Sequence, residues 1–546
     1  MNQRQRFIRK IIYACAIAAL LLPLSWLSQP ATRDSEGKEF EGGVLARMRK
    51  EHQLSQAALG EIDPASETIK LATLGMRGVA ANILWEKANY YKMTKDWTSL
   101  SATLEQIVKL QPNFVSVWIY QGWNLSYNIS VEFDDYHDRY YWVMKGIDFL
   151  KEGTSYNTQE PRLLAEIGET IGRKIGRSDE RVQFRRLFRE DDDFNGPLPL
   201  AQRDCWLVAR KWLLDSQQMV EQGIPMRGKS PILFYAQAPM CLISYGEALE
   251  EDGKFGEVAK DAWRKAADAW TIYGNRDLPS VYNFPIRLSD KEGYDERAKN
   301  AAAELENLTP AGLREKMEAE RMVSLTPEER EVYNMTPDQR STEQNDIMFG
   351  INAKLKIRPI DIADRITGEN RAAALKAAED AMQAEELAQA IDIERGIVNF
   401  SYWRMRCQME PRDDTLDARK FVYDGDQEFL QGHLVKSSEL YDQGWHKWAG
   451  VIKEFPRLLN ESTTIDDLME SIRHYRSVLQ QLDEKFPEPF VLQNVLDADA
   501  KARGVQVGKT TEAAAAEAKD STKPEEAASP DAPSAPPASG DETAKP

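Results

Sequence analysis

One short stretch of the chain carries the spacing of a nucleotide-binding loop. Gly223-Ile-Pro-Met-Arg-Gly228-Lys229-Ser230 matches GxxxxGK[ST], in which backbone amides and a lysine surround phosphate groups. That chemistry requires a buried strand before the loop and a helix N-terminus after it. The residues before Gly223 have helical periodicity, and Pro231 removes an N–H directly after the loop. We therefore predict a connection between two helices, with nucleotide binding as the alternative.

Several acidic clusters offer the oxygen ligands that calcium and magnesium prefer. None has the spacing of an EF-hand loop, so solvated turns are the simpler interpretation, and we expect no metal site. The clusters comprise Glu132, Asp134, Asp135, His137 and Asp138; Asp191, Asp192 and Asp193; and Asp424 with Asp426.

The histidine, cysteine and serine patterns give no indication of catalysis. The 5 histidines form no HExxH pair, the 4 cysteines form no CxxC pair, and no GxSxG sequence occurs. We therefore expect no enzyme activity, no catalytic residues and no cofactor. The residues concerned are His52, His137, His433, His446, His474, Cys15, Cys205, Cys241 and Cys407.

Length and charge limit the possible partners. The 546 residues include 70 Lys and Arg against 88 Asp and Glu, a formal net charge of −18. Such a surface repels a phosphate backbone, so nucleic acid is not an expected partner. The chain is long enough for two or more compact units.

The N-terminus has the pattern of a membrane anchor. Basic residues at Arg4, Arg6, Arg9 and Lys10 precede an apolar run over residues 11–27, which spans about 25 Å as a helix. No small-residue cleavage site follows, and lipoprotein-type cleavage before Cys15 would leave the apolar run attached. We predict an uncleaved signal anchor over residues 1–30 and a linker over 31–62. The basic cluster stays cytoplasmic, which places the rest of the chain in the periplasm outside the inner membrane.

The other end of the chain has the composition of a disordered tail. Residues 509–546 contain no Leu, Ile, Val, Met or aromatic side chain. Such a segment buries too little apolar surface to offset its chain entropy. We predict a linker and disordered tail over residues 491–546.

Between these ends apolar residues recur at helical spacing, which predicts an all-α fold. Asp63, Thr309, Thr326 and Thr336 each precede a proline, which is the pattern of a capped helix N-terminus. The charged residues 291–395 are predicted to form an insert of several helices with solvated faces.

Aromatic, small and proline residues also recur with a period of about 34 residues. One repeat begins at Ala81 and ends near Pro112, with Lys95 where a turn glycine is usual. The next repeat places Trp118 and Gly122 in its first helix. We interpret Pro112 as the end of a helical hairpin and Trp118 as a side chain that packs between neighbouring hairpins. Gly122 is interpreted as the point where two helices approach closely.

Weaker copies of this pattern follow and define the domain boundaries. They predict repeat domains over residues 63–290 and 396–490. The copies are marked by Gly146, Leu150 and Gly153; by Gly253, Ala259, Trp263 and Ala266; and by Gly425, Gly432, Ser437, Tyr441 and Gly444.

The spacing resembles the tetratricopeptide repeat and related helical-repeat families, which implies a solenoid of stacked hairpins. The chain is also similar to uncharacterised membrane-anchored proteins of planctomycete bacteria. This similarity rests on LWEKANYYKMTKDW, LQPNFVSVWIYQGWNLSYN, RYYWVMKGIDFLKEG and IVNFSYWRMRC. Some of those relatives are described as iron-responsive, and the sequence holds no ligand set for iron.

In such a solenoid the first helices line a concave groove, which is the usual place for a partner. Trp85 stands where the tetratricopeptide chaperone clamp needs a lysine, so an apolar or extended segment of another envelope protein is the expected partner. We therefore predict a membrane-anchored periplasmic scaffold. The alternatives are a ligand- or metal-binding protein or an enzyme with its site around residues 178–245, and a structural envelope component without a discrete ligand. The predicted groove residues are Trp85, Asn89, Lys92, Ile119, Trp123 and Ser126.

Overall fold

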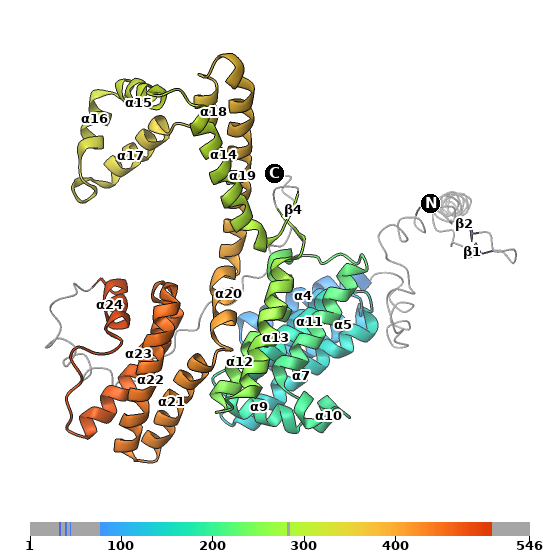
Figure 1. Cartoon of the computed structure of the whole chain (residues 1–546). Helices are drawn as coiled ribbons and strands as arrows, with labels where there is room; N and C mark the ends of the chain where they lie inside the picture. The colour runs from blue at the N-terminus through green and yellow to red at the C-terminus, as the bar shows by residue number, and fades with distance from the viewer. Residues whose placement is uncertain (1–31, 34–38, 41–43, 45–76, 281–283, 505–546) are drawn as a thin grey trace, which may run out of the picture. The chain divides into compact units, whose positions relative to one another are not determined.

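The computed structural model describes residues 32–33, 39–40, 44, 77–280 and 284–504 (Figure 1). Over these residues the protein is all-α, as predicted. The described strands are each two residues long and form two antiparallel pairs. The predicted anchor, most of the first linker and residues 505–546 of the predicted C-terminal linker and tail lie outside the described residues. Residues 491–504 are described, and the predicted start of the tail at residue 491 is wrong, because the helix α24 (Gln493–Ala502) forms there. Within those residues, no helix combines the length and the apolar character that crossing a membrane requires. The strand pairs are β1 (Thr32–Arg33) with β2 (Glu39–Phe40), and β3 (Leu278–Pro279) with β4 (Pro285–Ile286).

The chain divides into two compact units between Leu416 and Asp417. The sequence pattern instead starts the C-terminal domain at residue 396. The difference arises because α20 (Phe400–Met409) packs with the first unit. Trp270 Nε1 donates a hydrogen bond to the Phe400 carbonyl at 3.2 Å, and Arg406 Nη1 lies 2.7 Å from Glu247 Oε1.

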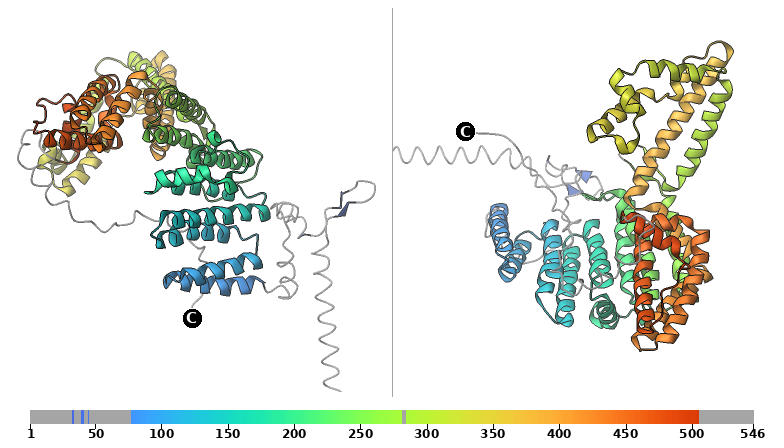
Figure 2. Two further views of the ribbon diagram at one scale, coloured as in Figure 1. Left: turned by 90° about the horizontal axis from the view of Figure 1, so that it is seen from below. Right: turned by 90° about the vertical axis from the view of Figure 1, so that its left-hand side faces the viewer.

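The first unit begins with helices that pack in pairs, and Figure 2 shows these pairs as successive layers running from blue to green. Each pair contacts the next, and one hydrophobic core continues from Ala81 to Ala248. The pairs are α4 (Arg77–Met93) with α5 (Trp97–Leu110), α6 (Val115–Trp123) with α7 (Tyr136–Tyr156), α8 (Pro161–Thr170) with α11 (Cys205–Glu221), and α12 (Pro231–Glu251) with α13 (Glu257–Gly274).

Shorter elements extend or connect these helices. Two of them, η2 and η4, are π-helical turns that continue α6 and α8. They therefore interrupt the regular helical winding of two neighbouring first helices. The shorter elements are η2 (Asn124–Ile129), η3 (Ser130–Glu132), η4 (Ile171–Gly176), α9 (Arg181–Glu190), α10 (Asp192–Asn195) and η5 (Leu200–Gln202).

The residues of the repeat pattern occupy packing positions. Trp118 is completely buried, and its Nε1 donates to the Pro112 carbonyl at 2.7 Å. A Cβ on Gly122 would come within 2.6 Å of the Leu150 side chain, so this position requires glycine. Lys95 adopts a φ of 55°, the left-handed conformation that the repeat usually gives to a glycine.

The charged insert consists of two long helices joined by a group of shorter ones. The long helices, α14 (Lys291–Leu308) and α19 (Arg371–Ile397), pack side by side, as Figure 1 shows. Alanines along α19 make this close packing possible, because Ala374, Ala378 and Ala384 are completely buried. The shorter elements are η6 (Leu288–Asp290), α15 (Leu313–Val323), α16 (Pro327–Asn334), η7 (Pro337–Gln339), α17 (Thr342–Leu355), α18 (Pro359–Ala363) and η8 (Gly368–Asn370).

The threonine–proline pairs of this insert behave differently from one another. Thr326 begins α16 with a complete capping box, as predicted. The predicted start at Thr309 is wrong, because the helix begins only at Leu313, after Gly312 takes a φ of 79°. Thr336 precedes only the short 3-10 turn η7.

The second unit is helical and uses the same glycine-based packing. Gly432 turns the chain between its first two helices with a φ of 78°, and a Cβ on Gly425 would lie 3.3 Å from the Tyr441 ring. Tyr441 and Trp445 stack in its core at an interplanar angle of 9°. Its elements are α21 (Asp413–Leu430), which starts just before the unit boundary, α22 (Leu434–Glu454), η9 (Pro456–Asn460), α23 (Ser462–Gln481) and α24 (Gln493–Ala502).

Candidate functional site

The loop with the phosphate-binding pattern connects α11 to α12. A helix precedes it where the motif needs a strand, and Ser230 is the N-cap of α12 with Pro231 in the first turn. Lys229 is held by carboxylates: its ammonium bonds to Glu169 and lies 4.0 Å from Glu166. The loop therefore lacks the strand–loop–helix geometry on which phosphate binding depends, and it connects two helices as predicted.

The acidic clusters serve as helix caps and hydrogen-bond acceptors. Asp135 caps α7 by accepting from the His137 amide at 2.7 Å. Asp191 caps α10 by accepting from the Phe194 amide at 2.9 Å, and it also accepts from the Tyr140 hydroxyl at 3.0 Å. Across the part of the chain that the structure describes, no group of His, Cys, Asp and Glu side chains is arranged to hold a metal ion.

A continuous series of rings runs along the first helices of the first two pairs. Trp85 of α4 contacts Tyr120 of α6, with ring centroids 5.8 Å apart. Tyr120 contacts Trp123 at 6.1 Å, and Trp123 stacks on Tyr127 of η2 at 5.9 Å. All of these rings are partly exposed. We refer to Trp85, Tyr120, Trp123 and Tyr127 as the aromatic face.

Two lysines lie over rings of the aromatic face. Lys92 Nζ is 5.5 Å from the centroid of Tyr120, and Lys174 Nζ is 4.3 Å from that of Tyr127. Burial raises the pKa of both tyrosines to about 12, so the phenols are neutral at physiological pH. The face thus combines neutral aromatic surface with two cations, which suits an apolar or aromatic segment that carries acidic residues.

The structure distributes the predicted groove residues over different environments. Trp85 and Trp123 belong to the aromatic face, and Lys92 lies over one of its rings. Asn89 is exposed one turn after Trp85 on the same side of α4. Ile119 is partly buried against the hydrophobic core.

Ser126 does not line a groove, and this prediction was wrong. Its side chain is completely buried, and its Oγ donates to the Val143 carbonyl at 3.2 Å. The prediction numbered positions along the 34-residue repeat as if the helix were a regular α-helix. The chain instead winds as the π-helix η2 from Asn124 onwards. The wider turn rotates the following side chains, so Ser126 points inward, while Tyr127 stays on the side of Trp123.

Sequence reasoning missed Tyr120 and Tyr127 as members of the face. With Trp123 they fall three and four residues apart, which places all three rings on one side of a helix. That spacing could have identified the two tyrosines. They were missed because groove residues were predicted only from their position within the 34-residue repeat.

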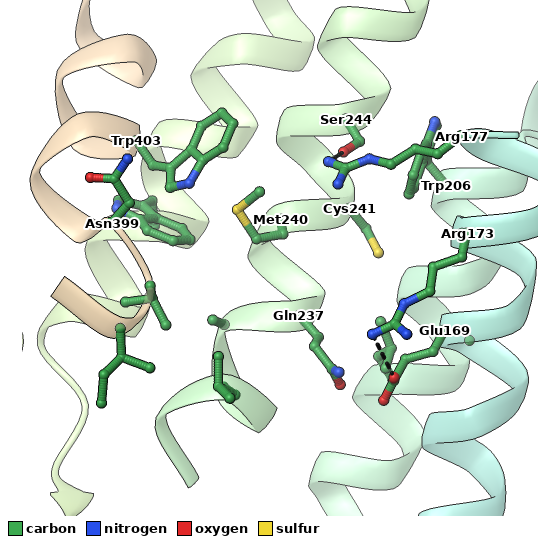
Figure 3. Close-up of a pocket in the computed structure, with 18 of the residues that line it drawn as sticks. Glu169, Arg173, Arg177, Trp206, Gln237, Met240, Cys241, Ser244, Asn399 and Trp403 are labelled. Atoms are coloured by element: carbon green, nitrogen blue, oxygen red, sulfur yellow. Dashed lines mark hydrogen bonds and ion pairs between the residues drawn. The ribbon is translucent and has the colours of Figure 1, made fainter. Parts of the chain in front are cut away.

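A cavity of about 550 Å³ lies further along the first unit, between η4, α11, α12 and the α19–α20 connection (Figure 3). Part of its lining comes from residues 206–244, within the region expected for a ligand site under the alternative prediction. The residues labelled in Figure 3 are Glu169, Arg173, Arg177, Trp206, Gln237, Met240, Cys241, Ser244, Asn399 and Trp403.

Glycines and one unusual backbone conformation shape this cavity. Gly172 and Gly176 leave room for the Trp206 ring, because a Cβ on them would lie 3.0 Å and 2.4 Å from it. Asn399 takes a φ of 47° in the turn between α19 and α20. That turn brings Trp403 to the opposite side of the cavity from Arg177, as Figure 3 shows.

The charged side chains of the cavity differ in whether they have an ion-pair partner. Glu169 bonds to Lys229 and lies 3.3 Å from Arg173 Nη2. Arg177 donates from Nη2 to Ser244 Oγ at 2.9 Å. No carboxylate of the described residues lies within ion-pair distance of Arg177, which is an exposed residue. Its remaining donors are therefore open to solvent or to a ligand.

No protein-family model matches the chain, and a comparison with curated proteins gives no match. The interpretation of both sites therefore rests on their geometry.

Proposed function

We propose that this protein is a membrane-anchored helical-repeat scaffold of the cell envelope that binds an extended segment of another envelope protein along its aromatic face. The fold assigned in this proposal is a tetratricopeptide-like solenoid of stacked hairpins. The sequence motifs that the chain shares with membrane-anchored planctomycete proteins support the anchored arrangement. The scaffold has no catalytic role in this proposal.

The series of ring contacts along the first helices carries the proposal. Trp85, Tyr120, Trp123 and Tyr127 contact one another in order and remain partly exposed, whereas Trp118 is completely buried. Aromatic side chains of this kind supply large contact area at a low cost in conformational entropy, and they recur in binding surfaces.

The chemistry of the aromatic face favours an apolar segment with acidic residues. The phenols are neutral, and Lys92 and Lys174 lie at the rings of Tyr120 and Tyr127. A segment that presents apolar side chains to the rings and carboxylates to the lysines matches both features.

The proposed location is the periplasmic side of the inner membrane. Support comes from the basic cluster and the apolar run at the N-terminus, which together predict an anchor with a cytoplasmic end. Protease added to spheroplasts is expected to degrade the chain down to a short protected fragment. Full protection of the chain until the membrane is dissolved would contradict this location.

Affinity capture of the full-length chain after mild crosslinking tests the binding function. We expect one dominant envelope protein to be captured by the unmodified chain and lost from Trp123→Ala. Tyr141→Ala is the matched control, because Tyr141 is 54% exposed on α7, a second helix.

The control variant is expected to retain the partner, and both variants are expected to unfold at the same temperature as the unmodified chain within a few degrees. Equal capture by Trp123→Ala and Tyr141→Ala, or capture without a dominant protein, would contradict the proposal.

A further inference from the structure

We propose that the cavity bounded by Arg177, Trp206, Gln237 and Trp403 is a binding site for a small carboxylic acid with an apolar tail. This inference concerns a different site from the aromatic face and does not depend on the scaffold function.

The polar end of the cavity has donors that the protein leaves unused. Arg177 spends one of its N–H groups on Ser244 and has no carboxylate partner in the described part of the chain. Its guanidinium carbon lies 5.6 Å from the ring centroid of Trp206. A carboxylate placed beside the guanidinium would accept from its remaining N–H groups.

Two buried polar atoms of the lining support this assignment. Trp206 is 6% exposed, and its Nε1 has no hydrogen-bond partner. Gln237 Oε1 is also buried without a partner, and turning over this amide would present its Nε2 as a further donor. Because unsatisfied buried polar groups are costly, a ligand that reaches these atoms after a small rearrangement of the two side chains would be favoured.

The charge balance favours an anion. The charged lining residues are Glu169, Arg173 and Arg177. Glu169 is already engaged by Arg173 and Lys229, which leaves Arg177, an exposed residue, as the charged lining side chain without an ion-pair partner in the described part of the chain. The Cys241 thiol stays neutral because burial raises its pKa to about 12, so it places no second negative charge beside the ligand.

The remainder of the cavity is apolar and suits a hydrocarbon tail. Trp270, Trp403 and Met240 line it, together with aliphatic side chains from α12 and the α19–α20 connection. Figure 3 places Trp403 across the cavity from Arg177, with Met240 between them. The volume of about 550 Å³ lies in the range of small-molecule sites.

Photoaffinity labelling of the full-length chain in a whole lysate of the cells that express it tests this inference. The probe is dodecanoic acid with a diazirine in its tail, and labelled residues are mapped by mass spectrometry after digestion. We expect labelling of the segments containing Met240 and Trp403, and we expect unmodified dodecanoate to compete. Dodecanol and dodecyltrimethylammonium, which lack the carboxylate, are expected not to compete.

Variants separate the carboxylate site from general lipid labelling. Arg177→Gln is expected to raise the dodecanoate concentration needed for half competition at least about tenfold, because a charge-assisted hydrogen bond is lost. Arg177→Lys keeps the positive charge, and its dodecanoate concentration for half competition is expected to lie between those of the unmodified chain and Arg177→Gln. Arg186→Gln, a change at an exposed arginine of α9, is the control and is expected to leave competition unchanged.

Labelling confined to the apolar run over residues 11–27 would overturn the inference. So would equal competition by dodecanol, or unchanged competition in Arg177→Gln. Trp403→Leu provides a readout independent of Arg177: it is expected to reduce labelling at Met240 severalfold, and full labelling would count against the site.

Discussion

Trp118 lies directly against Gly153: a Cβ built on this glycine would come within 2.8 Å of the indole ring. The same indole donates from Nε1 to the carbonyl of Pro112 at 2.7 Å. One side chain thus connects the proline that ends the first helix pair to the second helix of the next pair. Tryptophan, glycine and proline recur together in the sequence because each supplies one part of this contact.

Gly146→Ala is expected to destabilise the first unit by roughly 1–3 kcal/mol, because small-to-large changes in a tight contact force the backbone apart. A Cβ at this position would come within 2.5 Å of the Gly122 carbonyl oxygen, a backbone atom that cannot move aside. The free energy of unfolding, measured by urea titration with tryptophan fluorescence, checks this prediction.

Gly293→Ala is the matched control for this experiment. Gly293 also lies inside a helix, α14, and a Cβ there meets no atom within 4 Å. Since alanine favours the helix by up to about 1 kcal/mol, this variant is expected to be as stable as the unmodified chain or more so. Equal losses in both variants would show that close approach at Gly146 is not the cause.

Arg406→Met is expected to destabilise the first unit by roughly 3–5 kcal/mol, because it leaves a buried carboxylate without its guanidinium. Arg406 is 4% exposed and bonds to Glu247 and Glu410, each at 2.7 Å, while Glu410 is completely buried. Its guanidinium also lies 5.3 Å from the Trp263 ring centroid. Thermal unfolding followed by circular dichroism measures the loss.

The double variant Arg406→Met with Glu410→Gln distinguishes charge burial from lost packing. Replacing the carboxylate by an amide removes the buried negative charge that has lost its guanidinium, so the double variant is expected to be more stable than Arg406→Met alone. A double variant that is less stable than the single one would contradict this account of the cluster.

The ion pair between α14 and α19 is expected to make stability depend on pH. The two terminal guanidinium nitrogens of Arg395, Nη1 and Nη2, donate to Glu292 at 2.8 and 2.7 Å, and these hydrogen bonds lower the pKa of Glu292 from 4.5 to about 2. A lowered pKa means that the folded state favours the carboxylate. The stabilisation is therefore complete above about pH 4.5 and is lost as the pH falls towards 2.

Urea unfolding of the unmodified chain and of Glu292→Gln across this pH range measures the effect. The difference in free energy of unfolding between the two proteins is expected to shrink as the pH falls from 5 to 2. Arg395→Lys removes the bidentate hydrogen bonding to Glu292. In that background, the effect of Glu292→Gln on the free energy of unfolding is expected to depend less on pH. A difference that stays constant with pH would contradict the assignment.

Much of the fold could be read from the sequence because side-chain size and helical period determine it. Thr326 starts a helix because its hydroxyl caps the free amides, and Trp118 is buried where the repeat requires it. Lys95 shows that the backbone requirement outweighs residue preference, since it adopts the conformation usually given to glycine.

The rest depends on packing that a one-dimensional pattern does not contain. The π-helical winding of η2 moves Ser126 inward, away from the aromatic face. The cavity joins Arg177 to Trp403, which are far apart in the chain, through a turn in which Asn399 takes a positive φ. Neither feature follows from a repeat of about 34 residues.

A photoreactive amino acid placed at Asn89 tests the central claim most directly, because this exposed position lies one turn from Trp85 beside the aromatic face. In living cells we expect one discrete crosslinked product from Asn89, and we expect the product to disappear when Trp123→Ala is added. The same probe at Gln106, exposed on the second helix α5, is expected to give no such product. An identical product from both positions, or a product at Asn89 that survives Trp123→Ala, would contradict partner binding at the aromatic face.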